Sequence, residues 1–230
     1  MKLVGFYAAG RVKKRRKRRN YRPLLVLAAL VLVVAGVILA VRALFAKKIV
    51  PDAGLRYIGD IPVYEDFLPE DAMGRVNEKR EIKYVVIHET ANTAAGADAE
   101  AHNRYIHENG MTAELSWHYT VDDHQIYHHL PDDEPAFHAG DHMDKDGGNL
   151  NGIGVEMCVA SDNDYEKTVE NAALLAATLL VEYDLTPADG LRKHQDFSGK
   201  LCPLQMLEAG QWDSFVELVQ SNYDALKAEA

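Results

Sequence analysis

Cysteine is scarce in this sequence, with Cys158 and Cys202 the only two among 230 residues. Two cysteines are too few for the disulfide framework that stabilises many small exported domains, although they could form a single bridge. Cys158 ends the apolar run "GIGVEMC", which predicts a buried thiol, whereas Cys202 follows a polar loop and needs another role. The composition excludes a disordered chain, because 47% hydrophobic residues can bury a sizeable core, most simply as one domain with attachments.

Acidic residues are absent from residues 1–50, which carry 13 of the 25 Lys and Arg residues. All 35 acids follow, so the formal charge is +13 up to residue 50 and −23 beyond it. Polar side chains are also missing from Leu24 to Val41, and a helix of these eighteen residues, at ~1.5 Å each, crosses roughly 27 Å of hydrocarbon. We therefore expect a transmembrane anchor within residues 23–46 that contacts the cytoplasmic membrane through residues 24–41.

The residues that flank this apolar run indicate its orientation. A cleaved signal peptide is the alternative, but its apolar core usually runs ~7–15 residues, and no clean small-x-small cleavage site follows Val41. The run "KKRRKRR" precedes the span, so the positive-inside rule places a basic segment, residues 1–22, in the cytoplasm and residues 49–230 outside the cytoplasmic membrane. A nucleic-acid patch is another interpretation of such a run, but its position beside the span favours a topology signal.

We expect no nucleic-acid partner, because the basic run lies directly before the apolar span. We expect a monomer, because the span contains one glycine, Gly36, and no strong helix-pairing pattern. Residues 47–82 predict a linker that becomes an arm of the folded domain. They contain Pro, Gly and charges without sustained periodicity. Scattered apolar side chains could attach this arm to the core: Ile61, Val63, Tyr64, Phe67 and Leu68.

Residues 83–230 alternate predicted strands and helices. "KYVVIHET" (83–90) is a continuous β-branched run typical of a buried strand, and it delivers His88 at its C-terminal end. "SWHYTVDD" and "HQIYHHL" predict a hairpin that turns near Asp122 and Asp123, and residues 152–158 predict another strand. Helical spacing covers residues 97–109, 164–184 and 209–227. The predicted fold class is α/β, with a sheet covered by helices.

The stretch "HQDFSGKLCP" (194–203) brings His194, Lys200 and Cys202 together. A zinc site with an open position needs three protein ligands, and His and Cys are suitable types at ~2.0–2.3 Å. His194 and Cys202 could supply two of them, joined by a Ser-Gly loop, and His88 at a strand end is a candidate for the third. Spacing alone does not choose among ten histidines, and each could instead be a packed core residue.

Five motifs in order resemble one family. "VVIHET", "SWHYTVDD", "FHAGD", "NGIGVEMC" and "HQDFSGKLCP" are similar to the zinc-dependent N-acetylmuramoyl-L-alanine amidases of the type 2 family, related to phage endolysins, bacterial autolysins and peptidoglycan recognition proteins. The resemblance runs from about Lys83 to about Leu207. It implies a mixed central β-sheet flanked by helices, a zinc amidase catalytic domain over residues 83–230, and Zn²⁺ held by His88, His194 and Cys202.

The resemblance also implies two catalytic residues, Glu156 in the "IGVE" strand and Lys200 two positions before the ligand cysteine. A carboxylate beside zinc can accept the proton of the attacking water, and a cation can stabilise the negative charge of the tetrahedral intermediate. Without the resemblance, Glu156 would be read as an ordinary strand carboxylate and Lys200 as a solvated loop charge.

The sequence departs from the family pattern at one position, because Trp117 stands where some members of the wider family have a catalytic tyrosine. We therefore interpret Trp117 as a wall of the substrate groove and His118 as a structural residue. His138 of "FHAGD" is expected on the groove rim near zinc, as a substrate contact or a structural residue, and Asn92, like Glu89, is a candidate groove residue. We expect surface or packing roles for the other histidines: His102, His107, His124, His128, His129 and His142.

The implied reaction is hydrolysis of the amide between N-acetylmuramic acid and L-alanine of the peptidoglycan stem peptide, in remodelling or lysis of the bacterial cell wall. Two alternatives remain open. A recognition module would bind muropeptides without cleaving them, although the presence of Cys202 and Glu156 argues for an enzyme. A zinc peptidase would instead cut within the stem peptide. The sequence does not specify the stem-peptide preference, the biological process or the regulation.

Overall fold

The computed structural model describes residues 55–229. The predicted basic segment 1–22, the anchor 23–46 and its apolar span 24–41 lie outside the described residues. Within residues 55–229, no helix has both the length and the apolar character needed to cross a membrane. Residues Pro51–Ala230 form one compact unit.

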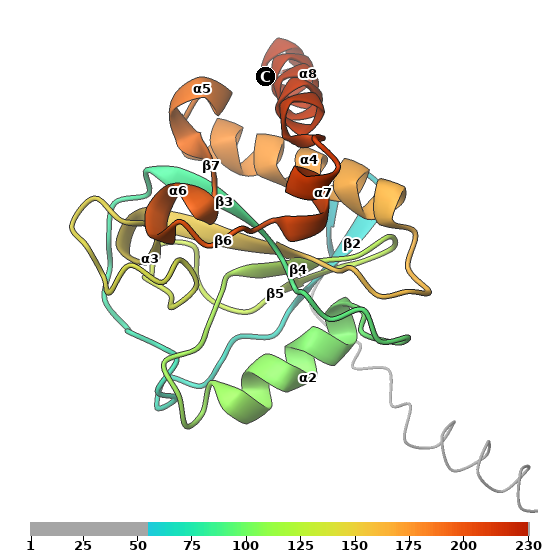
Figure 1. The fold of residues 1–230 in the computed structure, drawn as a ribbon. Helices are drawn as coiled ribbons and strands as arrows, with labels where there is room; N and C mark the ends of the chain where they lie inside the picture. Colours follow the sequence, from blue (N-terminus) through green and yellow to red (C-terminus); the bar gives the residue numbers. More distant parts are fainter. Residues whose placement is uncertain (1–54, 230) are drawn as a thin grey trace, which may run out of the picture. The chain divides into compact units, whose positions relative to one another are not determined.

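A seven-stranded mixed sheet forms the centre of this unit, in the order β1-β2-β5-β4-β6-β3-β7 (Figure 1). The strands are β1 Arg56–Ile58, β2 Ile61–Glu65, β3 Tyr84–Glu89, β4 Tyr119–Val121, β5 Ile126–His128, β6 Gly152–Met157 and β7 Leu191–Lys193. Neighbours are antiparallel in β1-β2 and β4-β5, and parallel in the other four pairs. The predicted strands at 83–90 and 152–158 and the predicted hairpin are confirmed.

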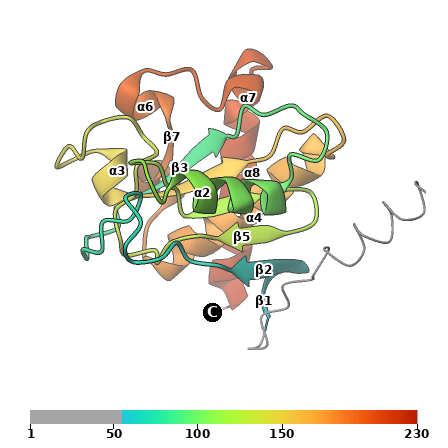
Figure 2. The same cartoon turned by 90° about the horizontal axis from the view of Figure 1, so that it is seen from below.

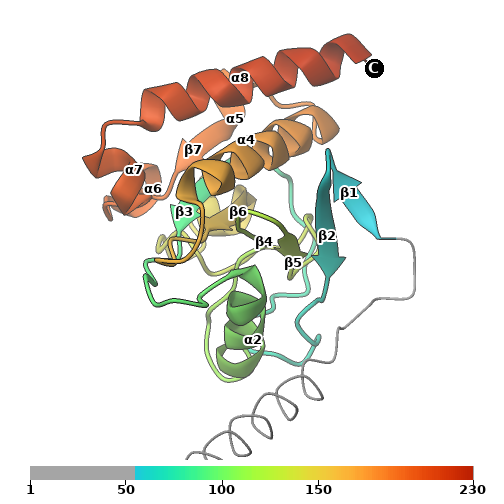
Figure 3. The same cartoon turned by 90° about the vertical axis from the view of Figure 1, so that its right-hand side faces the viewer.

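Helices cover both faces of the sheet. They are α2 Ala99–Asn109, α3 Gly148–Asn151, α4 Tyr165–Glu182, α5 Pro187–Gly190, α6 Gln195–Ser198, α7 Leu204–Glu208 and α8 Trp212–Glu229. The long helices α4 and α8 pack on one face and α2 on the other (Figure 3), and the view from below shows α2 lying across its face (Figure 2). The three predicted helices are therefore confirmed, and the predicted mixed sheet between helices is the observed fold.

Local sequence explains where the helices begin. The Asp98 side chain accepts a hydrogen bond from the Ala101 backbone at the start of α2, and the Asp164 side chain accepts one from the Lys167 backbone at the start of α4. Such caps satisfy amide groups that have no partner within the helix. Gly110 follows the last residue of α2, and its backbone amide donates to the Ile106 carbonyl.

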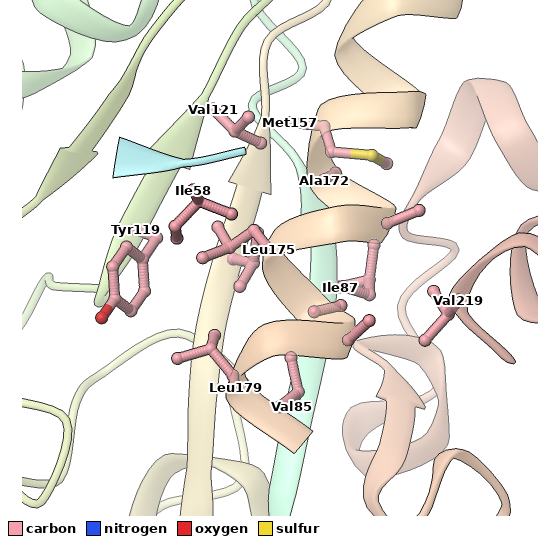
Figure 4. Close-up of a cluster of buried hydrophobic side chains, with 14 of the residues drawn as sticks. Ile58, Val85, Ile87, Tyr119, Val121, Met157, Ala172, Leu175, Leu179 and Val219 are labelled. Carbon is pink, nitrogen blue, oxygen red and sulfur yellow. The ribbon is translucent and has the colours of Figure 1, made fainter. Parts of the chain in front are cut away.

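The main hydrophobic core lies between the sheet and the pair α4 and α8. Odd-numbered residues of the central strands point into it, including Val85, Ile87, Tyr119 and Val121 (Figure 4). They meet small and aliphatic side chains of α4 and, beyond them, α8: Ala172, Leu175, Leu179 and Val219. Truncating one such buried leucine to alanine typically costs about 2–5 kcal/mol, so this face supplies much of the stability.

The arm over residues 47–82 holds more structure than its sequence indicated. Its described part contributes the edge strands β1 and β2, and Val63 and Leu68 are buried as predicted. A salt bridge between Arg75 and Glu134, 2.9 Å long and largely buried, ties the arm to the loop after β5. The guanidinium of Arg80 donates to backbone carbonyls of Glu134, Asn151 and Gly152.

A second buried polar cluster centres on Asp132. Its carboxylate accepts hydrogen bonds from the hydroxyls of Tyr119 and Tyr183, at 3.0 and 2.7 Å, and lies 3.1 Å from His128 Nε2. Burial alone would raise the pKa of Asp132, but its hydrogen bonds and the nearby His128 hold that pKa at about 2. The Asp132 carboxylate is therefore ionised at neutral pH although it is buried.

Candidate active site

The register of the strands places the predicted site residues in one row on the face opposite the main core. His88 on β3 pairs with Glu156 on β6, and Glu156 pairs with Thr120 on β4. His194 follows β7 directly, and its backbone amide donates to the Ile87 carbonyl at 3.2 Å. Side chains alternate between the two faces of a strand, so the residues that flank the core positions Ile87 and Val155 point to the other side.

The three predicted metal ligands meet at one point. His88 Nδ1 lies 3.0 Å from His194 Nδ1 and 4.0 Å from Cys202 Sγ, and all three ligand atoms lie within 4.8 Å of one another. The three residues are buried, with 1%, 5% and 5% of their surfaces exposed. Two imidazole nitrogens and one thiol at this spacing fit a zinc ion, for which ligand distances of ~2.0–2.3 Å are typical.

Electrostatics of the cluster also suit a cation. Burial, together with the neighbouring His138, His194 and Lys200, lowers the pKa of His88 well below its usual value, and burial and Lys200 lower the pKa of His194 to about 4. Both rings are therefore neutral and can offer a lone pair. Burial raises the pKa of Cys202 to about 12, so a nearby positive charge is needed to stabilise its thiolate.

The chain around residues 194–203 folds so that His194 and Cys202 face the same point. After His194 it makes the single turn α6, ends it at Gly199 with a left-handed φ of 76°, and returns. The Gln195 backbone amide then donates to the Cys202 carbonyl at 3.2 Å. The Asp196 carboxylate accepts from the backbone and side chain of Lys193 and fixes the entry to the turn.

Glu89 joins the first ligand strand to the segment that carries Cys202. Its backbone amide donates to Cys202 Sγ at 3.4 Å, and its buried carboxylate accepts from the backbone amides of Gln205 and Met206 and from the Tyr165 hydroxyl. The carboxylate thus caps the N-terminus of α7, two residues after the ligand cysteine. Glu89 is therefore a buried structural residue that holds the segment of Cys202 against β3. It also borders the smaller of two cavities beside the cluster, which agrees with its prediction as a candidate groove residue.

Glu156 lies beside the ligand cluster, with Oε1 3.8 Å from His88 Nδ1. Its Oε2 is buried and has no hydrogen-bond partner among residues 55–229. Burial raises the pKa of Glu156 to about 7, while the charge of Lys200 opposes this rise. A carboxyl group with such a pKa can both accept and return a proton near neutral pH.

Two cavities border the cluster, and the exposed Lys200 lines both. One, of about 950 Å³, is bordered by His138, His194 and Gly199. The other, of about 670 Å³, is bordered by Asn92 and Trp117 as well as Glu156. The two cavities provide space for substrate on both sides of the cluster, and every residue predicted to contact substrate lies on one of them.

The structure places the remaining predicted residues as follows. Trp117 is largely buried, and its indole Nε1 donates to Thr120 Oγ1 at 2.7 Å. His118 is fully buried, with Nδ1 accepting from the Gly154 amide and Nε2 lying 2.9 Å from the Glu134 carbonyl and 3.3 Å from the Arg80 guanidinium, which fits the expected structural role. Both cysteines are free, so the single-bridge alternative is wrong.

A carboxylate with a pKa near neutral, beside three side chains that could hold a metal ion, fits a hydrolase that uses a metal ion. Comparison with known proteins then narrows the class. The chain belongs to the N-acetylmuramoyl-L-alanine amidase family, whose family model matches residues 78–205.

Relatives in Bacillus subtilis (strain 168) support this membership. The amidase XlyA is 42% identical over 155 residues, which cover 67% of this chain and 50% of XlyA. The amidase CwlH is 40% identical over 162 residues, covering 70% of this chain and 62% of CwlH. The chain thus spans between half and two thirds of these relatives. A solved mutant endolysin from Bacillus subtilis superposes with a TM-score of 0.64 at 41% identity, covering 69% of this chain and 99% of the endolysin chain.

Proposed function

We propose that this protein is a zinc-dependent peptidoglycan amidase that hydrolyses the bond between N-acetylmuramic acid and L-alanine of the stem peptide. The observation that carries the proposal is the buried Glu156 carboxylate, whose Oε1 lies 3.8 Å from His88 Nδ1 and whose Oε2 has no hydrogen-bond partner among residues 55–229. His88 forms one cluster with His194 and Cys202. The names of the relatives, all N-acetylmuramoyl-L-alanine amidases, support the choice of bond. These three residues would hold the zinc ion, which when bound supplies a Lewis acid and lowers the pKa of water towards ~7.

Glu156 is the general base of the proposed reaction. Its carboxylate accepts the proton of the water that attacks the amide carbon, and the same oxygen then returns that proton to the leaving nitrogen of L-alanine. Both transfers require a pKa between those of the two partners, and burial in this site moves the pKa of Glu156 in that direction. No other hydrogen bond among the described residues competes for its Oε2.

Lys200 stabilises the negative charge that develops on the former carbonyl oxygen. It borders both cavities, and its charge lowers the pKa of Glu156, His88 and His194, so it acts on the whole cluster. Removing one such stabilising group commonly costs about 10²–10³ in kcat. The glycan and the stem peptide occupy the two cavities. In the smaller cavity Asn92 contacts the substrate, and the largely buried Trp117 forms a wall against which the substrate packs.

The substrate and the N-terminal residues suggest where the enzyme works. Residues 24–41 would anchor it in the cytoplasmic membrane, with residues 1–22 inside and the amidase unit facing the wall as a monomer. Protease treatment of intact wall-free cells tests this topology. A tag placed after residue 230 should be digested from outside while a tag before residue 1 is protected, and protection of both would overturn the proposed location.

The activity is tested with the purified full chain and its Cys202→Ser variant, by measuring bound zinc and the peptides released from purified peptidoglycan. We expect about one zinc per chain and whole stem peptides with a new N-terminal L-alanine, and we expect the variant to lose both. Fragments cut inside the stem peptide would indicate a peptidase instead. Zinc binding without release from any wall type would indicate a recognition module and remove the roles of Glu156 and Lys200.

A further inference from the structure

His138 stands between a backbone carbonyl and the first metal ligand. Its Nε2 lies 3.2 Å from the Gly152 carbonyl oxygen, and its Nδ1 lies 2.9 Å from Nε2 of His88. The other nitrogen of His88, Nδ1, faces His194 and Cys202. Gly152, His138, His88 and the ligand cluster therefore form one continuous line of contacts.

We propose that His138 is a positioning residue that holds His88 as the Nε2–H tautomer and so turns its Nδ1 lone pair toward the metal. This inference rests on the proposed zinc site. It assigns a specific task to a histidine whose place on the cavity rim had suggested contact with substrate.

The direction of the hydrogen bonds follows from the donors and acceptors available. A carbonyl oxygen only accepts, so His138 must carry its proton on Nε2 to bond with Gly152. A neutral imidazole has one N–H, so Nδ1 of His138 is an acceptor. His88 must then donate from its own Nε2, which leaves Nδ1 unprotonated. Histidine ligands commonly depend on such an outer partner to fix their tautomer and ring orientation.

The backbone on both sides of His138 is built to hold this ring in place. The Asn149 side-chain oxygen accepts from the amides of His138 and Ala139, at 2.7 and 2.6 Å. Below the ring lies Gly154 on β6, where a Cβ would lie 2.8 Å from His138 Cγ. The missing side chain of Gly154 is therefore what lets the ring settle on the sheet beside His88.

Substrate contact fits the geometry less well. His138 is only 9% exposed, and both of its nitrogens already have partners within the protein. A substrate could reach a ring nitrogen only by displacing one of these bonds. A substrate in the larger cavity therefore meets no ring nitrogen of His138 that lacks a partner.

Zinc affinity of the full chain, measured by competition with a chromophoric chelator, tests the inference without reference to turnover. We expect His138→Leu to weaken zinc binding about 10–100-fold, because the acceptor for His88 is lost. His138→Asn keeps an acceptor at the position of Nδ1 and should restore most of the affinity. His142→Asn is the matched control, since His142 borders the same cavity but has no contact with His88, and it should bind zinc like the parent.

Two further measurements distinguish a change in the position of the His88 ring from a loss of substrate contact. Gly154→Ala should reproduce the loss of affinity by displacing the ring, and the cobalt(II)-loaded chains should show altered absorption bands in the Leu and Ala variants but not in the Asn variant. Equal zinc affinity and cobalt spectra in the parent and His138→Leu, with lower turnover, would overturn the inference in favour of substrate contact. A parent that binds zinc but releases no peptide would refute the proposed reaction while leaving the His138 comparison intact.

Discussion

Replacing Glu156 by glutamine should stabilise the fold at alkaline pH while lowering the activity, because the carboxylate is buried and its Oε2 has no hydrogen-bond partner among residues 55–229. The folded pKa of about 7, against an ordinary value of 4.5, means that the folded state binds a proton more tightly than the unfolded state. The stability contributed by this group is present at low pH and is lost as pH rises through about 7. Two-state linkage with these values gives a loss of about 2.5 kcal/mol between pH 5 and pH 8.

The assay is urea unfolding of the metal-free chain, with chelator present, for the parent and Glu156→Gln at both pH values. The variant cannot ionise at this position, so the difference in unfolding free energy between variant and parent should move by about 2.5 kcal/mol in favour of the variant at pH 8. Its amidase activity should fall by about 10²–10⁴ while zinc content stays unchanged. The exposed Glu208 provides the control substitution, Glu208→Gln. A parent and variant whose stabilities run parallel from pH 5 to pH 8 would refute the reasoning.

Three further substitutions test other parts of the molecule. Lys200→Ala should lower kcat about 10²–10³-fold with zinc content unchanged, and Lys200→Arg should restore part of the lost kcat. Steady-state kinetics and metal analysis of both variants test this prediction. Glu89→Ala should cost about 1–3 kcal/mol in urea unfolding and also weaken zinc binding, because the segment of Cys202 loses the carboxylate that holds it; unchanged zinc affinity would contradict this role. Asp132→Asn should remove about 2 kcal/mol at pH 7 but little near pH 2, because the pKa of Asp132 is depressed and its contribution disappears as pH falls from about 4 to about 2; acid unfolding curves that coincide would count against this.

The elements found from the sequence are those whose signals are local. The strand β3 and the helix α4 carry long apolar patterns that need no partner to be recognised. The strands β2 and β7 were missed, because their five and three residues are held by pairing with the distant strands β5 and β3. The three-residue β1 was missed together with β2, with which it pairs. In β7, "LRK" resembles a solvated loop, and its register beside β3 is decided by tertiary structure.

The candidate site divides in the same way. The residue types in "HQDFSGKLCP" and the resemblance to a family predicted the three ligands, and the geometry brings them together. Glu89 and Gly154 were not given their roles, because those roles depend on partners remote in the chain, such as Cys202, 113 residues after Glu89. The sequence did contain one signal for the role of Gly154, because a glycine within a strand often marks the close approach of another group.

The alternation along the central strands has a consequence for how this protein can change over generations. In β3, β4 and β6, odd-numbered residues such as Ile87 and Val155 belong to the main core, and even-numbered residues face the other side of the sheet, where His88 and Glu156 belong to the site. Neighbouring codons therefore answer to different selective pressures, one for a lasting fold and the next for chemistry. A one-codon deletion within one of these strands would exchange the two sets of side chains and is expected to abolish both the packing and the site.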